Sequence, residues 1–412
     1  MPRSRAGLCF LSLLLVSPGI HSPRSVTAAD SRPRVFILNI DELTQTKEHI
    51  HRNDAASLSA LGRLERDAQR ALGGGTYSVV HKNLQPPSGD KHDYMSIAPY
   101  WWPNPNTPNG LPYVRRDGEV NPERDEASDR QRLDNLIQSI KTLAIGYFFT
   151  GKEEYAARAA TFMRVWFLDD ATKMNPHLKY AQAVPGRNVG RGAGVIETHN
   201  LPELIDAVGL LSSSKSWASI NHKPLRNWFD AYLNWLIESP EGKAESKAAN
   251  NHGSWFDVQI ASYSLFVERD ERAKKIMTEF STRRIAAQIE PDGRQPHELS
   301  RTRAWDYSIF NLEALFDAAS IADKLGIDLW RYETADKRGI RKTLDWLVPF
   351  AIGEKKWTYK QISAFQPEKL APLLRRAALR YNEPAYERSV SKIIGTAKDQ
   401  RWQLLYPAVA AK

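Results

Sequence analysis

Cysteine is almost absent from this sequence: Cys9 is the only one among 412 residues. It lies in an N-terminal segment that we expect to be removed, so we expect a mature chain with no thiol, no disulfide and no cysteine-bound metal. Its stability must then come from side-chain packing. A hydrophobic fraction of 42%, with 25% charged residues, is typical of a globular protein with a sizeable core.

Long apolar runs are also missing. The apolar stretch at residues 8–16 follows Arg3 and Arg5 and precedes small residues at 26–29, which is the pattern of a secretory signal peptide. No later segment is apolar over the roughly 20 residues that a membrane-spanning helix needs. We therefore predict a signal peptide at residues 1–28, export to a periplasm or to the outside of the cell, and no stable insertion in a membrane.

Acidic residues are outnumbered by basic ones. The formal net charge is +9, and loss of the signal peptide removes only arginines among the charged residues, so the mature chain stays basic. Such a protein can attract nucleic acid, an anionic surface or an acidic polysaccharide. The basic residues are dispersed, with no arginine-rich tail, zinc-finger spacing or aromatic RNA-binding motif. We therefore expect an acidic polysaccharide as the partner and no nucleic acid, and the sequence indicates no oligomeric state.

Alternating strand patterns are missing too, whereas apolar residues recur at helical spacing between loops rich in proline and glycine. The mature chain is thus predicted to be all-α, as one domain at residues 29–412. Helix hairpins repeated along most of a chain suggest a toroid or a solenoid. The predicted helices span residues 133–147, 155–167, 201–211, 225–237, 255–267, 273–289, 304–325, 340–350 and 370–381, and Gly151 is predicted to separate the first two.

Two irregular stretches interrupt the helices. Residues 185–194 are rich in glycine, but they lack the lysine context of a phosphate loop, so we do not expect a nucleotide site there. Residues 85–121 form a loop of a length that is usually functional. Its aromatic side chains either pack the loop against the body of the protein or form a lid that stacks on sugar rings: Tyr94, Tyr100, Trp101 and Trp102.

One set of polar residues indicates a specific chemistry. It consists of an amide-imidazole motif followed, further along the chain, by two guanidinium groups and a phenol: Asn250, Asn251, His252, Arg301, Arg303 and Tyr307. β-Elimination of a uronate requires neutralisation of the carboxylate, a base for the C5 proton and an acid for the departing O4 oxygen. Amide, imidazole, guanidinium and phenol together can supply all three.

Several motifs, in this order, resemble the alginate-lyase-like polysaccharide lyases over about residues 85–320. They are Lys-His-Asp-Tyr at 91–94, Pro-Tyr-Trp-Trp-Pro at 99–103, Asn-Asn-His-Gly-Ser-Trp at 250–255, and Arg-Gln-Pro-His-Glu at 294–298 with Arg301 and Tyr307 after it. The resemblance implies an incomplete (α/α) toroid and a secreted enzyme that cleaves a polyuronate by elimination without a cofactor. The loop at 94–102 is more similar to that of the glucuronan-cleaving relatives than to that of the enzymes restricted to alginate.

The resemblance also implies roles. Asn251 and an arginine would hold the uronate carboxylate, and Tyr307 would donate a proton to O4. His252, or Tyr307 as a phenolate beside positive charge, would take the C5 proton. Arg301 matches the family arginine, but Arg303 would share a helix face with Tyr307 if the segment were helical, whereas a bend would favour Arg301.

Further residues are predicted to bind substrate: Asn250, Arg303, Tyr94, Tyr100, Trp101, Trp102, His199, Asn200 and His297. His199 with Asn200 would cap a helix or add a second group that neutralises a carboxylate. No spacing of histidines and carboxylates resembles a zinc or calcium site, so we predict no catalytic metal.

Two other functions are compatible with the residues. A glycoside hydrolase on an (α/α) toroid would need two carboxylic acids across the scissile bond, with candidates Asp93, Glu197, Asp257, Glu298 and Asp306. A non-catalytic protein could grip an acidic chain with arginines and aromatics. Our preferred hypothesis is a polyuronate lyase that acts on glucuronan or another β-1,4-glucuronate or mannuronate polymer, with alginate among the candidates, ahead of guluronate.

Overall fold

The computed structural model describes the chain except for residues 2–31, 127–128, 218, 396–399 and 410–412. The predicted signal peptide and Cys9 lie outside the described residues. The chain divides into two units, residues 1–32 and Pro33–Lys412. The second unit holds all the helices and strands discussed below.

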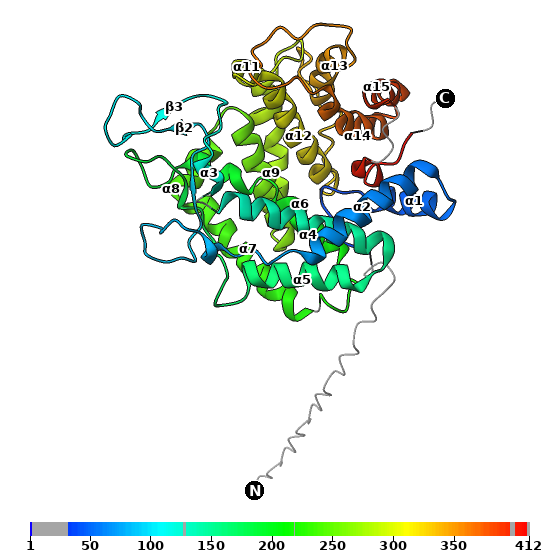
Figure 1. The fold of residues 1–412 in the computed structure, drawn as a ribbon. Coiled ribbons are helices and arrows are strands. Elements are labelled where there is room, and N and C mark those ends of the chain that lie inside the picture. The colour runs from blue at the N-terminus through cyan, green and yellow to red at the C-terminus, as the bar shows by residue number, and fades with distance from the viewer. Residues whose placement is uncertain (2–31, 127–128, 218, 396–399, 410–412) are drawn as a thin grey trace. The chain divides into compact units, whose positions relative to one another are not determined.

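Helices make up most of this unit, which confirms the all-α prediction (Figure 1). None of the helices in the described part of the chain is both long and apolar enough to cross a membrane. The α-helices are α1 (Ile40–His51), α2 (Ala55–Gly73), α3 (Glu123–Glu126), α4 (Arg130–Thr150), α5 (Glu153–Phe167), α6 (Leu201–Leu210), α7 (Ser219–Glu238), α8 (Pro240–Ser246), α9 (Asn251–Phe266), α10 (Asp270–Phe280), α11 (Pro296–Leu299), α12 (Ala304–Asp323), α13 (Ile340–Ala351), α14 (Ala371–Tyr381) and α15 (Pro384–Ile394).

Shorter helical turns join some of these elements. Four are 3₁₀ turns: η2 (Val79–His81), η3 (Gly192–Thr198), η5 (Pro367–Leu370) and η6 (Arg401–Leu404). The fifth, η4 (Ser281–Ala286), is a π-helical turn that continues α10. The predicted helix at 273–289 is therefore continuous but changes its winding, a change that often accompanies a functional site.

Helix hairpins form the body of the unit. Pairs of consecutive helices pack together in α4–α5, α9–α10 and α14–α15. Gly151 ends α4 with a φ of 70°, a left-handed conformation that glycine adopts without steric cost, so the chain can turn back at once into α5. The sequence predicted this turn correctly.

α9 is the innermost helix. It packs against α6, α7, α10 and α12, and every one of its residues except His252 is buried. A helix that is buried on all sides needs apolar or internally bonded residues around its whole circumference rather than on one face. α9 therefore fixes the centre of the structure, and its N-terminus opens onto the candidate site.

The four strands are short and lie in the loops predicted to be irregular. β1 (Met95–Ile97) pairs in parallel with β4 (Tyr180–Ala183), and β2 (Trp101–Trp102) pairs antiparallel with β3 (Val114–Arg115). β1 also contacts α3 and β4 contacts η3, which joins this pair of strands to the helical body.

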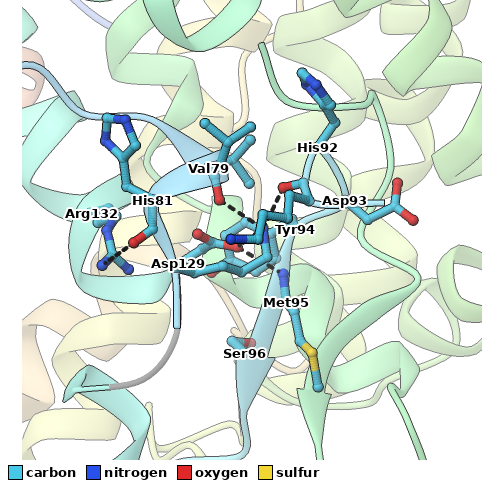
Figure 2. Close-up of polar contacts among 12 residues, drawn as sticks. Val79, His81, His92, Asp93, Tyr94, Met95, Ser96, Asp129 and Arg132 are labelled. Atoms are coloured by element: carbon cyan, nitrogen blue, oxygen red, sulfur yellow. Dashed lines mark hydrogen bonds and ion pairs between the residues drawn. The ribbon is translucent and has the colours of Figure 1, made fainter. Parts of the chain in front are cut away.

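A buried ion pair anchors β1 to the helical body. Lys82 Nζ lies 3.1 Å from Asp129 Oδ2, and both side chains are inaccessible to solvent. The same Asp129 oxygen accepts a hydrogen bond from the Met95 backbone N–H over 3.0 Å, as Figure 2 shows. Loss of either partner would be costly, because it would leave the other charge buried and unpaired.

Candidate active site

A cavity of about 410 Å³ lies between the loop after β1, the segment that includes η3, and the starts of α9 and α12. We call it the arginine cavity, because five arginines and a single carboxylic acid are among its lining residues. The lining comprises Pro99, Tyr100, Trp101, Arg115, Arg124, Arg130, Gln182, Arg191, Ala193, Ile196, Glu197, His199, Asn250, Asn251, His252, Arg301, Tyr307 and Phe310.

Asn251, the first residue of α9, is held by a carboxylate from a distant part of the chain. Its backbone N–H and its Nδ2 donate to the two carboxylate oxygens of Glu298, each over 2.7 Å. Glu298 thereby satisfies a backbone donor that a helix start leaves unpaired. One Nδ2 hydrogen is used in this contact, which leaves the other available at the cavity wall.

His252 follows directly and is oriented by a second carboxylate. Its Nδ1 lies 2.6 Å from Oε1 of Glu245, a buried residue of α8. An ionised carboxylate can only accept a hydrogen bond, so in the neutral imidazole Nδ1 carries the proton and Nε2 keeps its lone pair. This is the arrangement of a histidine base held in one tautomer by an acidic neighbour.

The π-helical turn η4 supports this end of α9. Arg284 donates from Nε to Asp257 of α9 over 2.7 Å and from Nη1 to the Ala248 carbonyl oxygen over 2.7 Å. Gly253 makes room for this guanidinium, since a Cβ there would overlap it. Close packing thus requires a glycine after His252, and the contacts of Arg284 hold the start of α9 in place.

Tyr307 lies in the first turn of α12, and its hydroxyl is 2.5 Å from the hydroxyl of Tyr100. The guanidinium carbon of Arg301 lies 3.8 Å from the centre of the Tyr307 ring. Burial raises the pKa of Tyr307, Tyr100 raises it further, and the charge of Arg301 opposes this rise. Tyr307 is therefore a protonated phenol at neutral pH and can donate a proton.

The geometry separates the two candidate arginines. Both precede α12, which begins at Ala304, so the helical spacing that would favour Arg303 does not apply. Arg301 lines the arginine cavity, whereas Arg303 pairs with Asp306 over 3.1 Å and lines a neighbouring depression on the other side of Tyr307. The bend before α12 favours Arg301 as the arginine beside the phenol.

Asp117, near the end of the long loop, holds Arg301 in place. Its carboxylate accepts hydrogen bonds from Nε and Nη2 of Arg301, the shorter over 2.9 Å, and from the Thr302 backbone and hydroxyl. Burial acts to raise the pKa of Asp117, but Arg301 and Thr302 outweigh it and lower the pKa to about 2. Asp117 is therefore ionised at any working pH.

Comparison with known proteins identifies the family. A family model described as alginate lyase matches residues 78–357. A crystal structure of an alginate lyase from Bacteroides ovatus is 40% identical, with a TM-score of 0.88, and the match covers 91% of this chain and 99% of that chain. The chain belongs to the alginate lyase family. A comparison with curated protein sequences gives no match.

More distant alginate lyases share the fold. A variant of alginate lyase A1-III complexed with a tetrasaccharide is 15% identical, with a TM-score of 0.57, over 91% of this chain and 96% of that chain. Alginate lyase A1-III from Sphingomonas species A1 is 15% identical, with a TM-score of 0.54, over 83% and 94%. This alginate lyase family member is a polysaccharide lyase with the predicted (α/α) toroid of helix hairpins.

The aromatic residues of the long loop do not all behave as predicted. Tyr100 and Trp101 line the arginine cavity. Tyr94 is fully buried and donates from its hydroxyl to Glu197 over 2.7 Å, so the prediction that it stacks on a sugar is wrong. Trp102 is not a lining residue, and its Nε1 donates to the Glu119 carbonyl oxygen over 3.0 Å.

His199 lines the cavity but cannot neutralise a carboxylate. Its Nδ1 lies 2.9 Å from the Ile196 carbonyl oxygen, and its ring packs 5.0 Å from both Trp255 and Phe310. Burial, and after it the charge of Arg130, lowers the pKa of His199 to about 3. The ring is therefore neutral, which corrects the prediction of a charged binding group.

Two further substrate-binding predictions do not fit this cavity. Asn200 lines a different cavity, and its Nδ2 lies 3.4 Å from Asp134 Oδ1. His297 is exposed on α11 and does not line the arginine cavity. By contrast Asn250, the residue before α9, lines the cavity as predicted.

The carboxylates proposed for a hydrolase do not form a pair across this cavity. Of the five, only Glu197 lines it, and that side chain is buried and bonded to Tyr94 and Ser96. Each of the others is engaged elsewhere: Asp93 with Ser88 and Asn175, Asp257 with Arg284, Glu298 with Asn251, and Asp306 with Lys369. Family membership likewise excludes the hydrolase and the non-catalytic alternatives.

Sequence reasoning missed three residues that shape the site: Glu245, Asp117 and Gln182. Glu245 lies in α8 and His252 in α9, and the break between these helices removes any helical spacing that could have linked them. Asp117 and Gln182 act across long loop connections.

In the described part of the chain no three His, Cys, Asp or Glu side chains are grouped so as to hold a metal ion.

Proposed function

We propose that this polysaccharide lyase is exported and cleaves a polymer of β-1,4-linked glucuronate or mannuronate by β-elimination. The observation that carries the proposal is the meeting of Asn251, His252, Arg301 and Tyr307 in one cavity whose charge is supplied mainly by arginine. An anionic sugar chain complements that charge. The similarity of the long loop to glucuronan-cleaving relatives favours glucuronan.

Arg301 and Asn251 hold the carboxylate of the reacting uronate in this proposal. Asp117 takes the Nε and Nη2 side of Arg301, so Nη1 faces the substrate. The second Nδ2 hydrogen of Asn251 is the other donor. Both stabilise the negative charge that develops on the carboxylate when C5 loses its proton, and removing one such donor typically costs about 10²–10³ in kcat.

His252 and Tyr307 then divide the proton transfers. Nε2 of His252 takes the C5 proton, the electron pair forms the C4–C5 double bond, and the C4–O4 bond breaks with O4 receiving the Tyr307 proton. In glucuronate and mannuronate H5 and O4 lie on the same face of the ring, so one residue on that face could both remove H5 and protonate O4. Tyr307 would have to be a phenolate to act as that base, and its raised pKa opposes this. His252 is therefore the better base.

The test is ultraviolet absorbance of the unsaturated product. The mature protein and its Tyr307→Phe variant would be incubated with glucuronan, mannuronate-rich alginate, guluronate-rich alginate and glycosaminoglycans. We expect absorbance to rise with glucuronan or mannuronate, and to be lost in the variant by about 10²–10⁴-fold because the proton donor is gone. Tyr147→Phe is the matched control, because it removes a hydroxyl on α4 that contacts the Ser213 hydroxyl and lies outside the arginine cavity.

Each other outcome contradicts part of the proposal. No absorbance with any polymer would overturn the substrate class. Cleavage restricted to guluronate would overturn the choice of sugar. Full activity of Tyr307→Phe would remove the phenol from the mechanism.

Export is tested separately, by the N-terminal sequence of the protein recovered from outside the cytoplasm. We expect it to begin near residue 29, after the predicted signal peptide. An uncleaved N-terminus, or a protein that stays in the cytoplasm, would refute the export proposal and leave the lyase activity unaffected.

A further inference from the structure

Arg191 lines the arginine cavity but has no part in the elimination described above. It lies in the glycine-rich segment 185–194 and is held from behind by β4. Its Nη2 donates to Gln182 Oε1 over 2.5 Å, and its backbone N–H donates to the Ala181 carbonyl oxygen over 3.1 Å. Gln182 has a φ of 50°, which is uncommon for a residue with a side chain and is often found at functional sites.

The glycines beside Arg191 allow its backbone to lie close to neighbouring chain segments. A Cβ at Gly190 would overlap the Lys179 carbonyl oxygen, and a Cβ at Gly192 would lie 2.8 Å from the Glu241 carbonyl oxygen. Any other residue would push the segment outward on either side of Arg191. These two glycines therefore fix the backbone on either side of Arg191.

The other arginines of the cavity have acidic partners. Arg130 pairs with Asp134 over 3.0 Å, Arg124 with Asp125 over 2.7 Å, and both Arg115 and Arg301 with Asp117 over 2.6 and 2.9 Å. Arg191 makes no ion pair with any described residue, and its buried Nε has no hydrogen-bond partner there.

Burial lowers the pKa of Arg191, the charge of Glu197 opposes this, and the charge of Arg115 adds to it, so that the net shift of the pKa is downward. A partly desolvated cation that makes no ion pair is stabilised when a ligand brings an anion into direct contact with it. The cavity that it lines admits that ligand.

We propose that Arg191 binds the carboxylate of a second uronate, adjacent to the one being cleaved. The substrate must then carry consecutive uronates, and a polymer that alternates uronate with a neutral sugar is a poor substrate. Arg301 and Asn251 already serve the reacting carboxylate. Arg191 comes from a different segment, next to Arg115, and meets the chain one sugar further along. This inference rests on the proposed function and names its substrate class more closely.

The test compares two trisaccharides in wild type and Arg191→Gln. One is a β-1,4-glucuronate trimer, and in the other the uronate adjacent to the cleaved one is reduced to glucose. We expect wild type to lose about 10–100-fold in kcat/KM when that carboxylate is removed, since a hydrogen bond to a charged group is lost. Arg191→Gln should lose as much on the unmodified trimer and nothing further on the reduced one.

Two measurements distinguish a binding role from a structural one. The Tm of Arg191→Gln should equal or exceed that of wild type, because an unpaired buried charge is removed. Arg187→Gln is the matched control: this exposed arginine of the same segment lies over the Trp101 ring outside the cavity lining, and we expect it to retain kcat/KM within about twofold.

Other outcomes overturn the inference. Equal losses in Arg191→Gln on both trisaccharides would assign Arg191 to the reacting carboxylate. A lower Tm with unchanged kcat/KM would make it structural. If wild type produced no unsaturated ends from any polyuronate, the proposed function itself would fail, and that result is distinct from both.

Discussion

Two cavities meet at His199 and differ in how their charges are satisfied. The arginine cavity has five arginines and one carboxylic acid in its lining. The second, of about 350 Å³, has four carboxylic acids and two basic residues, and we call it the paired cavity. Its charged lining residues are Lys141, Glu203, Asp206, Glu313, Asp317 and Arg376.

In the paired cavity most charges are satisfied by the protein itself. Lys141 pairs with Glu203 over 2.6 Å, and Arg376 with Asp317 over 2.8 Å. Asp206 accepts three backbone hydrogen bonds from residues 36–38. A largely paired set of charges holds helices together, whereas an excess of one sign attracts a ligand of the other. The excess of positive charge in its lining, and not its volume, distinguishes the active site.

The largest effect is expected at His252, the proposed catalytic base in the lining of the arginine cavity. His252→Gln should lower kcat by about 10²–10⁴-fold, because the amide cannot accept the C5 proton. Initial rates of double-bond formation on glucuronan would measure it, with Lys141→Gln in the paired cavity as the comparison. Equal losses in the two variants would erase the functional difference between the cavities.

The converse change is in the paired cavity. Arg376→Met should lower the free energy of unfolding by about 3–5 kcal/mol, because Asp317 is left buried and unpaired. Denaturant unfolding would measure this, and KM of the folded enzyme should stay within about twofold. Lys392→Met, which breaks a surface pair with Glu354, should cost less than about 1 kcal/mol. A raised KM of Arg376→Met without a loss of stability would place substrate in the paired cavity.

A smaller effect is expected at Glu245, whose carboxylate orients His252. Glu245→Gln should lower kcat by about 10–100-fold, because a neutral amide no longer stabilises the imidazolium or selects the Nδ1 tautomer. An unchanged kcat would show that Glu245 only packs against the ring.

The smallest effect concerns Glu313, which lines the paired cavity. Burial, then the charges of Asp317 and Glu203, raises its pKa from 4.5 to about 7. The folded state therefore binds this proton more tightly, so its contribution to stability is full below pH 4.5 and is lost as the pH rises through 7.

Glu313→Gln should remove that loss. We expect the variant to match wild type near pH 5 and to be more stable by about 1–2 kcal/mol near pH 8. Thermal unfolding of the two proteins across this range would show it. A difference that is constant with pH would mean that the carboxyl does not titrate in this window.

The helical body could be predicted well from the sequence. Apolar spacing located α4, α5, α6, α9, α12, α13 and α14 within about four residues, because burial of a helix face imposes a period on the sequence. It also found α7, whose start at Ser219 precedes the predicted start at 225. It did not identify α1, α2, α8 or α15. The start of α9 was placed too late, since Asn251 and His252 are polar and signal a site rather than a helix.

The members of the site were predictable in part, and their partners were not. The sequence alone determined which chemical groups were available, because amide, imidazole, guanidinium and phenol are properties of residues. Only the tertiary structure decided that Arg301 and not Arg303 lies against Tyr307, that Tyr94 is buried, and that Glu245 orients His252. Those outcomes depend on where helices break and on contacts between residues far apart in the chain, which leave no local period or spacing in the sequence.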